Sequence, residues 1–395
     1  MMSALGPTLP RPLPPGSVRR RHAMALLLVL FAVFGVPRAV HAELRPDWTP
    51  KRTWVFVVGL LQWQHADIYP SFPEARKDRR DEQLVRFFRT AGVPSAQITY
   101  LQDAAATKHR IETEFIKLLD QTNEGDLLIL YFCGHGSRDL RTGQTWFASY
   151  DAGKAWNSAW GVRGIFSAIE EHFSGNRALL LADCCHSGAL YDEARRRANS
   201  QIAFAAITSA YSHNTSTGAW TFSDSVLAGL RGDGAVDFDG DSVIELNELA
   251  RYAELEMAFV EQQRSMFFAA DRFPRQAKLA ARAAGNPYAN LHLEALYGGR
   301  WYKVRVLEAR GNERRVHYLG YDDTWDEWLG PERLRPYRPK EHAAGSHVLV
   351  RWANDGQWYP ATILQAWYGL HLVHYEGYGA TWDEWVAADA IKPRP

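Results

Sequence analysis

Two short stretches of the chain decide its fold. The first is Tyr131-Phe132-Cys133-Gly134-His135-Gly136-Ser137, and the second is Leu181-Ala182-Asp183-Cys184-Cys185-His186-Ser187-Gly188. Each stretch contains or follows an apolar run typical of a buried strand, at residues 127–130 and 178–181. Because the carboxyl ends of neighbouring strands meet in one crevice of an open α/β sheet, His135 and Cys185 are expected to lie together. A thiol beside an imidazole is the minimum arrangement for attack on a peptide bond.

The sequence around these stretches alternates strand and helix patterns. This alternation predicts one α/β domain over residues 43–285, with a mainly parallel sheet covered by helices on both faces. Thr107 is expected to cap one of the helices, and the Ala- and Arg-rich segment that ends near Asn286 is expected to link domains. Further strands are expected at 54–60, 98–101 and 202–208, and helices at 81–90, 107–119, 164–173 and 247–264.

Residues 1–42 have the pattern of an export signal. Three arginines at positions 19–21 precede a 12-residue apolar run at 25–36, and small residues at 39–42 provide a cleavage site. The apolar run is short for a membrane span, so we expect a secreted or periplasmic protein that begins near Glu43. An uncleaved signal that anchors the protein to a membrane is the alternative.

Charge and cysteine content narrow the function classes. The formal net charge is zero, but without residues 1–42 the chain has 40 basic and 45 acidic residues, a net charge of −5. Such a mildly acidic body gives no support for nucleic-acid binding. The chain has three cysteines, and two of them are adjacent. This number and spacing do not predict a framework of disulfide bonds. A free thiol in an exported protein is better explained by a role in catalysis than by a role in stability.

The segment from Trp54 to Gly285 resembles the caspase-like cysteine peptidases, in particular the metacaspases and their bacterial relatives. The resemblance rests on His135-Gly136 after a strand and on the stretch 183–188, which fits the Asp-x-Cys-His-Ser-Gly pattern of that branch. It implies that Cys185 is the nucleophile, that His135 is its partner, and that the backbone N–H groups of Gly136 and Cys185 form the oxyanion hole. The chemistry would then require no cofactor.

The resemblance also suggests which substrate is cut. Asp183 stands two residues before the nucleophile, where metacaspases use an acid to bind a basic residue of a protein or peptide substrate. We therefore expect cleavage after Arg or Lys. One alternative is a catalytically silent scaffold that only binds partners. Another is a zinc site, which would use Cys133, His135, Cys184 and His186.

The C-terminal hundred residues contain a duplication. The segment that ends in Thr324-Trp325-Asp326-Glu327-Trp328 recurs 57 residues later, ending in Thr381-Trp382-Asp383-Glu384-Trp385. The two copies, residues 286–340 and 341–395, resemble chromo-barrel or Tudor-knot domains, which are small all-β SH3-like barrels. Aromatic side chains either fill such a core or form cages for an unidentified protein ligand. The candidate cage residues are Tyr318, Tyr321, Trp325, Trp328, Tyr375, Tyr378, Trp382 and Trp385.

An acidic loop at residues 237–248 has the spacing of an EF-hand calcium loop. Carboxylates stand at its positions 1, 3, 5, 9 and 12, and calcium prefers such oxygen ligands. Ser242 departs from the pattern, because the sharp turn there normally uses Gly. The alternative is a purely structural turn in which Asp241 or Asn247 caps the following helix. The five predicted ligands are Asp237, Asp239, Asp241, Glu245 and Glu248.

Overall fold

The computed structural model describes most of the chain after residue 46. The described ranges are 47–73, 75–139, 141–155, 158–212, 219–283, 292–353, 355–367 and 369–394. The expected export signal therefore lies outside the described residues. Within these ranges, every helix is too short or too polar to cross a membrane.

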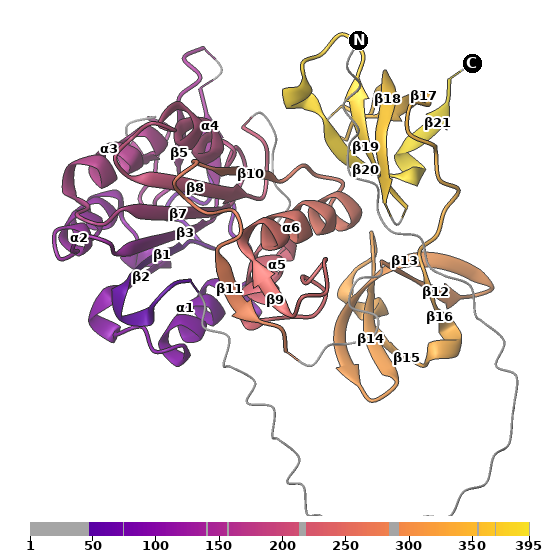
Figure 1. Cartoon of the computed structure of the whole chain (residues 1–395), viewed down its shortest axis with the longest axis horizontal. Coiled ribbons are helices and arrows are strands. Elements are labelled where there is room, and N and C mark those ends of the chain that lie inside the picture. The colour runs from indigo at the N-terminus through magenta and orange to yellow at the C-terminus, as the bar shows by residue number, and fades with distance from the viewer. Residues whose placement is uncertain are drawn as a thin grey trace, which may run out of the picture. The chain divides into compact units, whose positions relative to one another are not determined.

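A six-stranded sheet forms the centre of the first domain (Figure 1). Its strand order is β10-β8-β7-β3-β1-β2, with five parallel strands and antiparallel β10 at one edge. This architecture confirms the predicted α/β class with a mainly parallel sheet. The strands are β1 (Thr53–Gly59), β2 (Ile98–Gln102), β3 (Leu127–Cys133), β7 (Arg177–Asp183), β8 (Ala203–Thr208) and β10 (Met266–Ala269).

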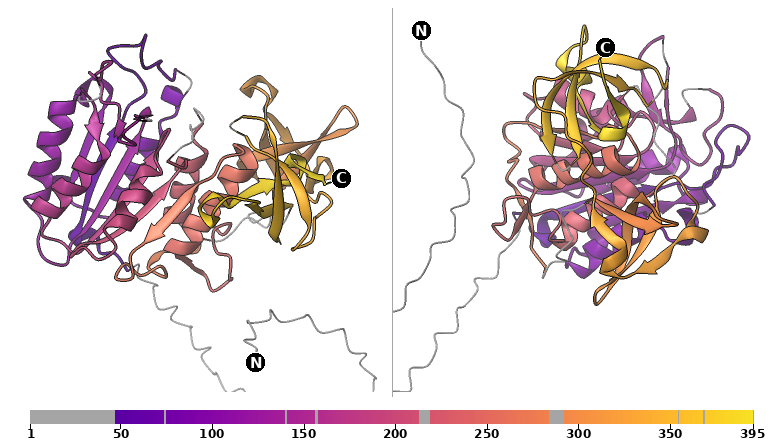
Figure 2. Two further views of the ribbon diagram at one scale, coloured as in Figure 1. Left: turned by 90° about the horizontal axis from the view of Figure 1, so that it is seen from above. Right: turned by 90° about the vertical axis from the view of Figure 1, so that its right-hand side faces the viewer.

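Helices cover both faces of this sheet because its central strands alternate apolar side chains between two hydrophobic cores. One core includes Phe56 and Leu130 with residues of α2, α3 and α4, and the other includes Val57 and Tyr131 with residues of α1, α5 and α6. Figure 2 shows helices on either side of the strands. The helices are α1 (Arg80–Thr90), α2 (Lys108–Leu119), α3 (Val162–His172), α4 (Ala189–Arg196), α5 (Thr221–Arg231) and α6 (Leu246–Val260).

The predicted start of α2 is confirmed in detail. Thr107 is the N-cap, and its Oγ1 accepts a hydrogen bond of 3.4 Å from Arg110 N. The carboxylate of Asp151 accepts a second bond, of 2.8 Å, from Lys108 N. These bonds satisfy two of the N–H groups that a helix leaves without intrahelical partners.

The expected linker between helix α6 and Asn286 is wrong over most of its length. Met266–Ala269 forms β10, which pairs with β8, and β11 (Lys278–Ala281) pairs with β9 (Val243–Glu245). The run Met-Phe-Phe in β10 is too short for a clear period, and only its position at the sheet edge makes it a strand. The domain therefore continues to at least residue 283.

A small three-stranded sheet carries the residues that follow β3. It consists of β4 (Gly136–Arg138), β5 (Thr145–Phe147) and β6 (Trp160–Gly161), all antiparallel. Phe147 stacks on Phe132 of β3 with ring centroids 4.4 Å apart. This contact fixes the small sheet at the carboxyl end of the central strand.

Two five-stranded antiparallel sheets follow, one in each copy of the duplication (Figure 1). We call residues 292–340 the first repeat and residues 341–394 the second repeat. The long strand of each copy has a bulge, between Val306 and Glu308 and between Ile363 and Gln365, again 57 residues apart. The strands are β12 (Leu293–Tyr297), β13 (Arg300–Arg310), β14 (Glu313–Tyr318), β15 (Glu327–Leu329), β16 (Leu334–Pro336), β17 (His347–Arg351), β18 (Trp358–Trp367), β19 (Leu370–Tyr375), β20 (Glu384–Ala387) and β21 (Ile391–Pro393).

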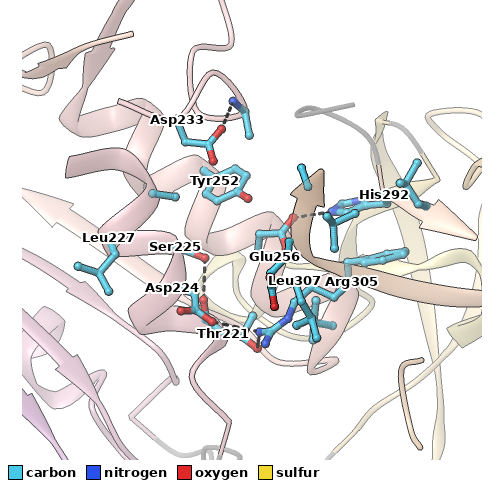
Figure 3. A pocket seen from close by; sticks show the side chains of 18 of the residues that line it. Thr221, Asp224, Ser225, Leu227, Asp233, Tyr252, Glu256, His292, Arg305 and Leu307 are labelled. Carbon is cyan, nitrogen blue, oxygen red and sulfur yellow. Dashed lines mark hydrogen bonds and ion pairs between the residues drawn. The ribbon is translucent and has the colours of Figure 1, made fainter. Parts of the chain in front are cut away.

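A cavity of about 610 Å³ is lined by α5, α6 and strand β13 of the first repeat (Figure 3). Its charged side chains pair across this boundary. His292 Nε2 lies 3.0 Å from Glu256 Oε1, and Arg305 lies 3.4 Å from Asp224. These pairs attach the first repeat to the α/β domain, and we assign no ligand to the cavity.

Candidate active site

The register of two adjacent strands positions His135 and Cys185. Strands β3 and β7 are parallel neighbours, and Cys133 at the end of β3 pairs with Asp183 at the end of β7. His135 and Cys185 each follow two residues beyond this pair. Because neighbouring strands lie about 4.8 Å apart, both side chains leave the sheet at the same edge. The two motifs therefore follow neighbouring strand ends at the same edge of the sheet, and the Cys185–His135 pair stays a prediction.

The loops after β3 and β7 are in direct contact. Gly134 N donates a hydrogen bond of 3.3 Å to Asp183 O. A Cβ atom on Gly136 would lie 1.8 Å from the carbonyl oxygen of Cys185 and 3.3 Å from Cys184 Sγ. No side chain fits there, so glycine at position 136 is required for the close approach. The approach places the Gly136 and Cys185 backbones side by side, as a shared oxyanion hole needs.

The environment of His135 suits a general base. Its Nε2 lies 2.8 Å from Pro70 O, and since a carbonyl only accepts, Nε2 carries the proton. The neutral ring therefore has its lone pair on Nδ1. Trp63 and Phe72 pack on the imidazole with ring centroids 4.4 and 4.6 Å away. Burial among these rings lowers the pKa of His135, and the Pro70 carbonyl opposes this effect. The imidazole is accordingly neutral at neutral pH.

The loop after β7 holds Cys185 by contacts with residues 209–212. His186, the next residue, adopts a left-handed backbone with φ of 58°, and its Nδ1 lies 3.1 Å from Ser212 O. Ala210 N donates a bond of 3.0 Å to Ser187 Oγ, and Cys184 N donates one of 3.1 Å to Ser209 Oγ. The left-handed backbone of His186 is unfavourable and persists only where neighbouring residues enforce it, and such conformations are common at functional sites. These contacts hold His186 and its neighbours against the segment 209–212.

The other two cysteines are buried and belong to opposite faces of the sheet. Cys133 is part of the core under α1, α5 and α6, whereas Cys184 is part of the core under α2, α3 and α4. Burial raises the pKa of both thiols well above the ordinary value. Cys185 is half-buried. Among the described residues, the set of close metal-ligand atoms does not include the four candidates for a zinc site.

Asp183 is the last residue of β7, at the same edge of the sheet. Its side chain is buried, and its Oδ2 accepts a hydrogen bond of 2.6 Å from Ser223 Oγ of α5. Burial raises its pKa to about 7, the bonds from Ser223 and Ser209 oppose this rise, and the nearby Glu261 adds to it. Glu261, just after α6, is a second acid here that sequence reasoning missed because a distant helix brings it in.

The acidic loop brings three of its five predicted calcium ligands together. Carboxylate oxygens of Asp237, Asp239 and Glu248 lie within 4.8 Å of one another. Asp237 also forms an ion pair of 3.0 Å with Arg282, which a cation would have to displace. Ser242 has a φ of 72°, the conformation for which this turn position normally uses Gly.

The remaining two predicted ligands have structural roles at this loop. Asp241 Oδ1 accepts a bond of 2.8 Å from Val243 N. Glu245 is the N-cap residue of α6 and forms a capping box with Glu248, so neither Asp241 nor Asn247 caps the helix. Calcium binding stays a prediction.

If the loop binds calcium, the melting temperature should be higher by a few °C in millimolar calcium than in EDTA, because a ligand that binds only the folded state stabilises it. Asp239→Asn should abolish this shift, and Asp271→Asn, at an exposed acid elsewhere, should keep it. Differential scanning calorimetry provides the measurement. Equal melting temperatures in calcium and EDTA would leave the loop as a structural turn.

Each repeat gathers most of its candidate cage residues into one aromatic cluster. In the first repeat Tyr321 lies 5.8 Å from Trp325, and in the second repeat Tyr378 lies 5.9 Å from Trp382, between ring centroids. Tyr302 and Tyr359 belong to these clusters as well. Sequence reasoning missed both, although they belong to the repeated Trp-Tyr pair.

The two outer tryptophans of the candidate set lie elsewhere. Trp385 is 3% exposed and packs against Leu255 and Phe259 of α6. Trp328, on β15, lies under the guanidinium of Arg310, which is 4.5 Å from the ring centroid. Trp385 therefore serves packing, and Trp328 contacts Arg310. The aromatic cluster of the second repeat lines a cavity of about 120 Å³. This cavity is lined by Trp352, Tyr359, Tyr375, Tyr378 and Trp382.

The central sheet is mainly parallel, and the loops that carry His135 and Cys185 follow the ends of its adjacent strands β3 and β7. The caspase-domain family model matches residues 69–272, more than half of the chain, and the protein belongs to this family. The Tudor-knot model, described as the RNA binding activity-knot of a chromodomain, matches residues 343–393 in the second repeat.

Three individual proteins are similar to parts of the chain. A protein of Geobacter sulfurreducens is 13% identical with a TM-score of 0.39, over 59% of this chain and all of its own. The Drosophila initiator caspase Dronc is 10% identical with a TM-score of 0.36, over 63% of this chain and 90% of its own. The chromatin modification-related protein EAF3 of Eremothecium gossypii is 54% identical over 45 residues, 11% of this chain. The chain spans only 14% of the length of that curated relative.

Proposed function

We propose that the protein is a cysteine endopeptidase that cleaves polypeptides through Cys185 and His135. One observation carries the proposal. The His loop and the Cys loop leave paired positions of β3 and β7, and the Gly136 position is so close to the Cys185 carbonyl that a side chain would overlap it. Within the caspase family this arrangement supports catalysis, whereas a scaffold would not need it.

The mechanism follows from the neutral state of His135, whose Nδ1 carries the lone pair. His135 Nδ1 accepts the thiol proton while Cys185 Sγ attacks the substrate carbonyl carbon. The negative charge that develops on the carbonyl oxygen is stabilised by the N–H groups of Gly136 and Cys185. The imidazolium then donates its proton to the leaving amine, which frees the first product and leaves a thioester. Water, deprotonated by His135, hydrolyses the thioester and restores the thiol.

Asp183 and Glu261 support a preference for a basic residue before the scissile bond. Asp183 is two residues before Cys185, and Glu261 is close enough to raise its pKa; negative charge at this position would attract a cation and disfavour an acidic side chain. Asp183 can act in this way only when ionised. Its pKa of about 7 means that the carboxyl group is largely neutral in acid and charged above neutrality.

A fluorogenic peptide panel with Arg, Lys, Asp or a neutral residue at this position tests the proposal. We expect kcat/KM for the Arg peptide to rise with pH through about 7, as Asp183 ionises. For the neutral peptide, the rise of kcat/KM with pH should occur at a lower pH than for the Arg peptide, because the pKa of His135 is lowered. Asp183→Asn should remove the Arg preference and make the two profiles coincide. An Arg preference that survives this substitution would contradict the assignment, and absence of any cleavage would favour the silent scaffold.

We further propose that the aromatic cavity of the second repeat binds a cationic side chain of a protein partner. Five aromatic side chains line one small space, and aromatic rings attract a methylated ammonium group through cation–π interactions. The hydroxyls of Tyr359 and Tyr375 donate to Asp355 and Glu384 over 2.7 and 2.6 Å.

Export of the protein depends on residues 1–42 and stays a prediction.

A further inference from the structure

The second repeat is packed on the α/β domain through an apolar interface. Leu255 and Phe259 of α6 form one hydrophobic cluster with Leu370 and Trp385 of the second repeat. The guanidinium of Arg251, also on α6, lies 4.2 Å from the ring centroid of Trp385. Buried apolar contacts of this kind favour one orientation of two units over others, unlike a flexible tether.

A second contact joins the repeat to the loop that supports the nucleophile. Arg264 donates a hydrogen bond to the carbonyl oxygen of Thr381, and its guanidinium lies 5.0 Å from the ring centroid of Tyr211. The Tyr211 ring lies 5.8 Å from that of Trp382. Residues 381 and 382 of the second repeat therefore contact the segment that follows β8.

Trp382 connects this contact to the aromatic cavity, because the same ring lines the cavity and packs on Tyr211. Tyr211 precedes Ser212, whose carbonyl oxygen lies 3.1 Å from His186 Nδ1, next to Cys185. The cavity is thus placed beside the catalytic crevice, at its β8 side, by a short series of direct contacts. The packing on α6 keeps it there.

We propose that the aromatic cavity of the second repeat is a substrate exosite at a fixed distance from Cys185. The enzyme would then favour polypeptides that carry a methylated lysine at one defined spacing from the scissile bond. This inference rests on the proposed peptidase function. A tethered recruiting domain would instead accept many spacings, since a flexible linker samples many distances.

A peptide series tests the fixed spacing. Each peptide carries the preferred basic residue at the cleavage position and one trimethyl-lysine placed from two to twelve residues away, on either side. For each variant, kcat/KM is divided by that of a short peptide without the distal residue. We expect this ratio to rise about tenfold at one narrow spacing, corresponding to about 1.4 kcal/mol. Unmodified lysine at the same spacing should give a smaller ratio.

Tyr378→Ala and Tyr321→Ala form a matched pair for this experiment. They are equivalent positions of the two repeats, and they are 46% and 45% exposed, so neither substitution disturbs a buried core. Tyr378→Ala should abolish the spacing optimum and Tyr321→Ala should retain it. A flat ratio in the wild type, or equal loss in both variants, would overturn the proposal.

A binding measurement separates failure of the exosite from failure of the peptidase function. If the short peptide is not cleaved at all, the peptidase proposal fails. Fluorescence anisotropy of the same labelled peptides with the full chain carrying Cys185→Ala then still reports on the exosite. Affinity should peak at one spacing and lose that peak with Tyr378→Ala. An affinity that does not change with the spacing, or that Tyr378→Ala does not change, would contradict the exosite whatever the result of the cleavage assay.

Discussion

Cys185→Ala is expected to reduce kcat/KM for an Arg peptide by about 10⁴-fold or more, since the reaction requires the nucleophile and the neighbouring Cys184 is buried. His135→Ala should cause a loss of similar size, because without the neutral imidazole the thiol loses its proton acceptor. The double variant should be no worse than either single variant, since the two side chains act as one unit. Initial rates on the preferred peptide provide the measurement.

The neighbouring cysteine provides the control for this prediction. Cys184 is adjacent in sequence but 2% exposed, with its side chain in the core on the α2, α3 and α4 side. Cys184→Ala should therefore lower stability modestly through a small cavity and retain most of the activity. Comparable losses for Cys184→Ala and Cys185→Ala in folded protein would mean that the nucleophile is assigned wrongly.

Gly136→Ala is expected to reduce kcat/KM by about 10² to 10³-fold, the usual cost of losing one oxyanion donor. The added Cβ would lie 1.8 Å from the Cys185 carbonyl oxygen, so the two loops must separate. Separation moves the N–H groups of residues 136 and 185 apart and misplaces His135. The melting temperature should fall as well, because a close contact between the loops is lost.

Gly164→Ala is the matched control for this substitution. Gly164 lies in α3, and a Cβ there would meet no atom within 4 Å. The same chemical change should therefore leave kcat/KM unaffected and raise stability slightly, because Ala is the better helix former. If Gly136→Ala retained full activity, the oxyanion hole could not include the Gly136 backbone in the geometry described above.

The sequence was sufficient to predict the five parallel strands of the central sheet, but not β10, and to place the two motifs at neighbouring strand ends. The apolar runs of β3 and β7 are continuous, and the parallel arrangement then fixes where His135 and Cys185 emerge. The surroundings of His135 were not predictable in this way. Pro70, Trp63 and Phe72 come from an irregular segment after β1 whose path depends on tertiary contacts. Likewise, Glu261 approaches Asp183 only because α6 ends there.

The repeats show the same limit in another form. The constant offset of 57 residues predicted two equivalent modules, and their matching bulges confirm the equivalence. Equivalence in sequence did not reveal that Trp385 packs on α6 while Trp328 lies under Arg310. A tryptophan in the same sequence pattern can lie in a core, in an interface or on a ligand-binding surface. Which of these roles it has depends on the element packed against it.

Covalent labelling with an arginyl chloromethyl ketone tests the central claim most directly. The reagent should place one adduct on each folded chain, at Cys185 Sγ, as determined by intact mass and by fragment sequencing. An excess of the Arg peptide should slow the labelling, and His135→Ala should slow it further, because alkylation requires the thiolate that His135 helps to generate. Absence of an adduct in folded protein, or an adduct mainly on Cys133 or Cys184, would contradict a Cys185–His135 peptidase.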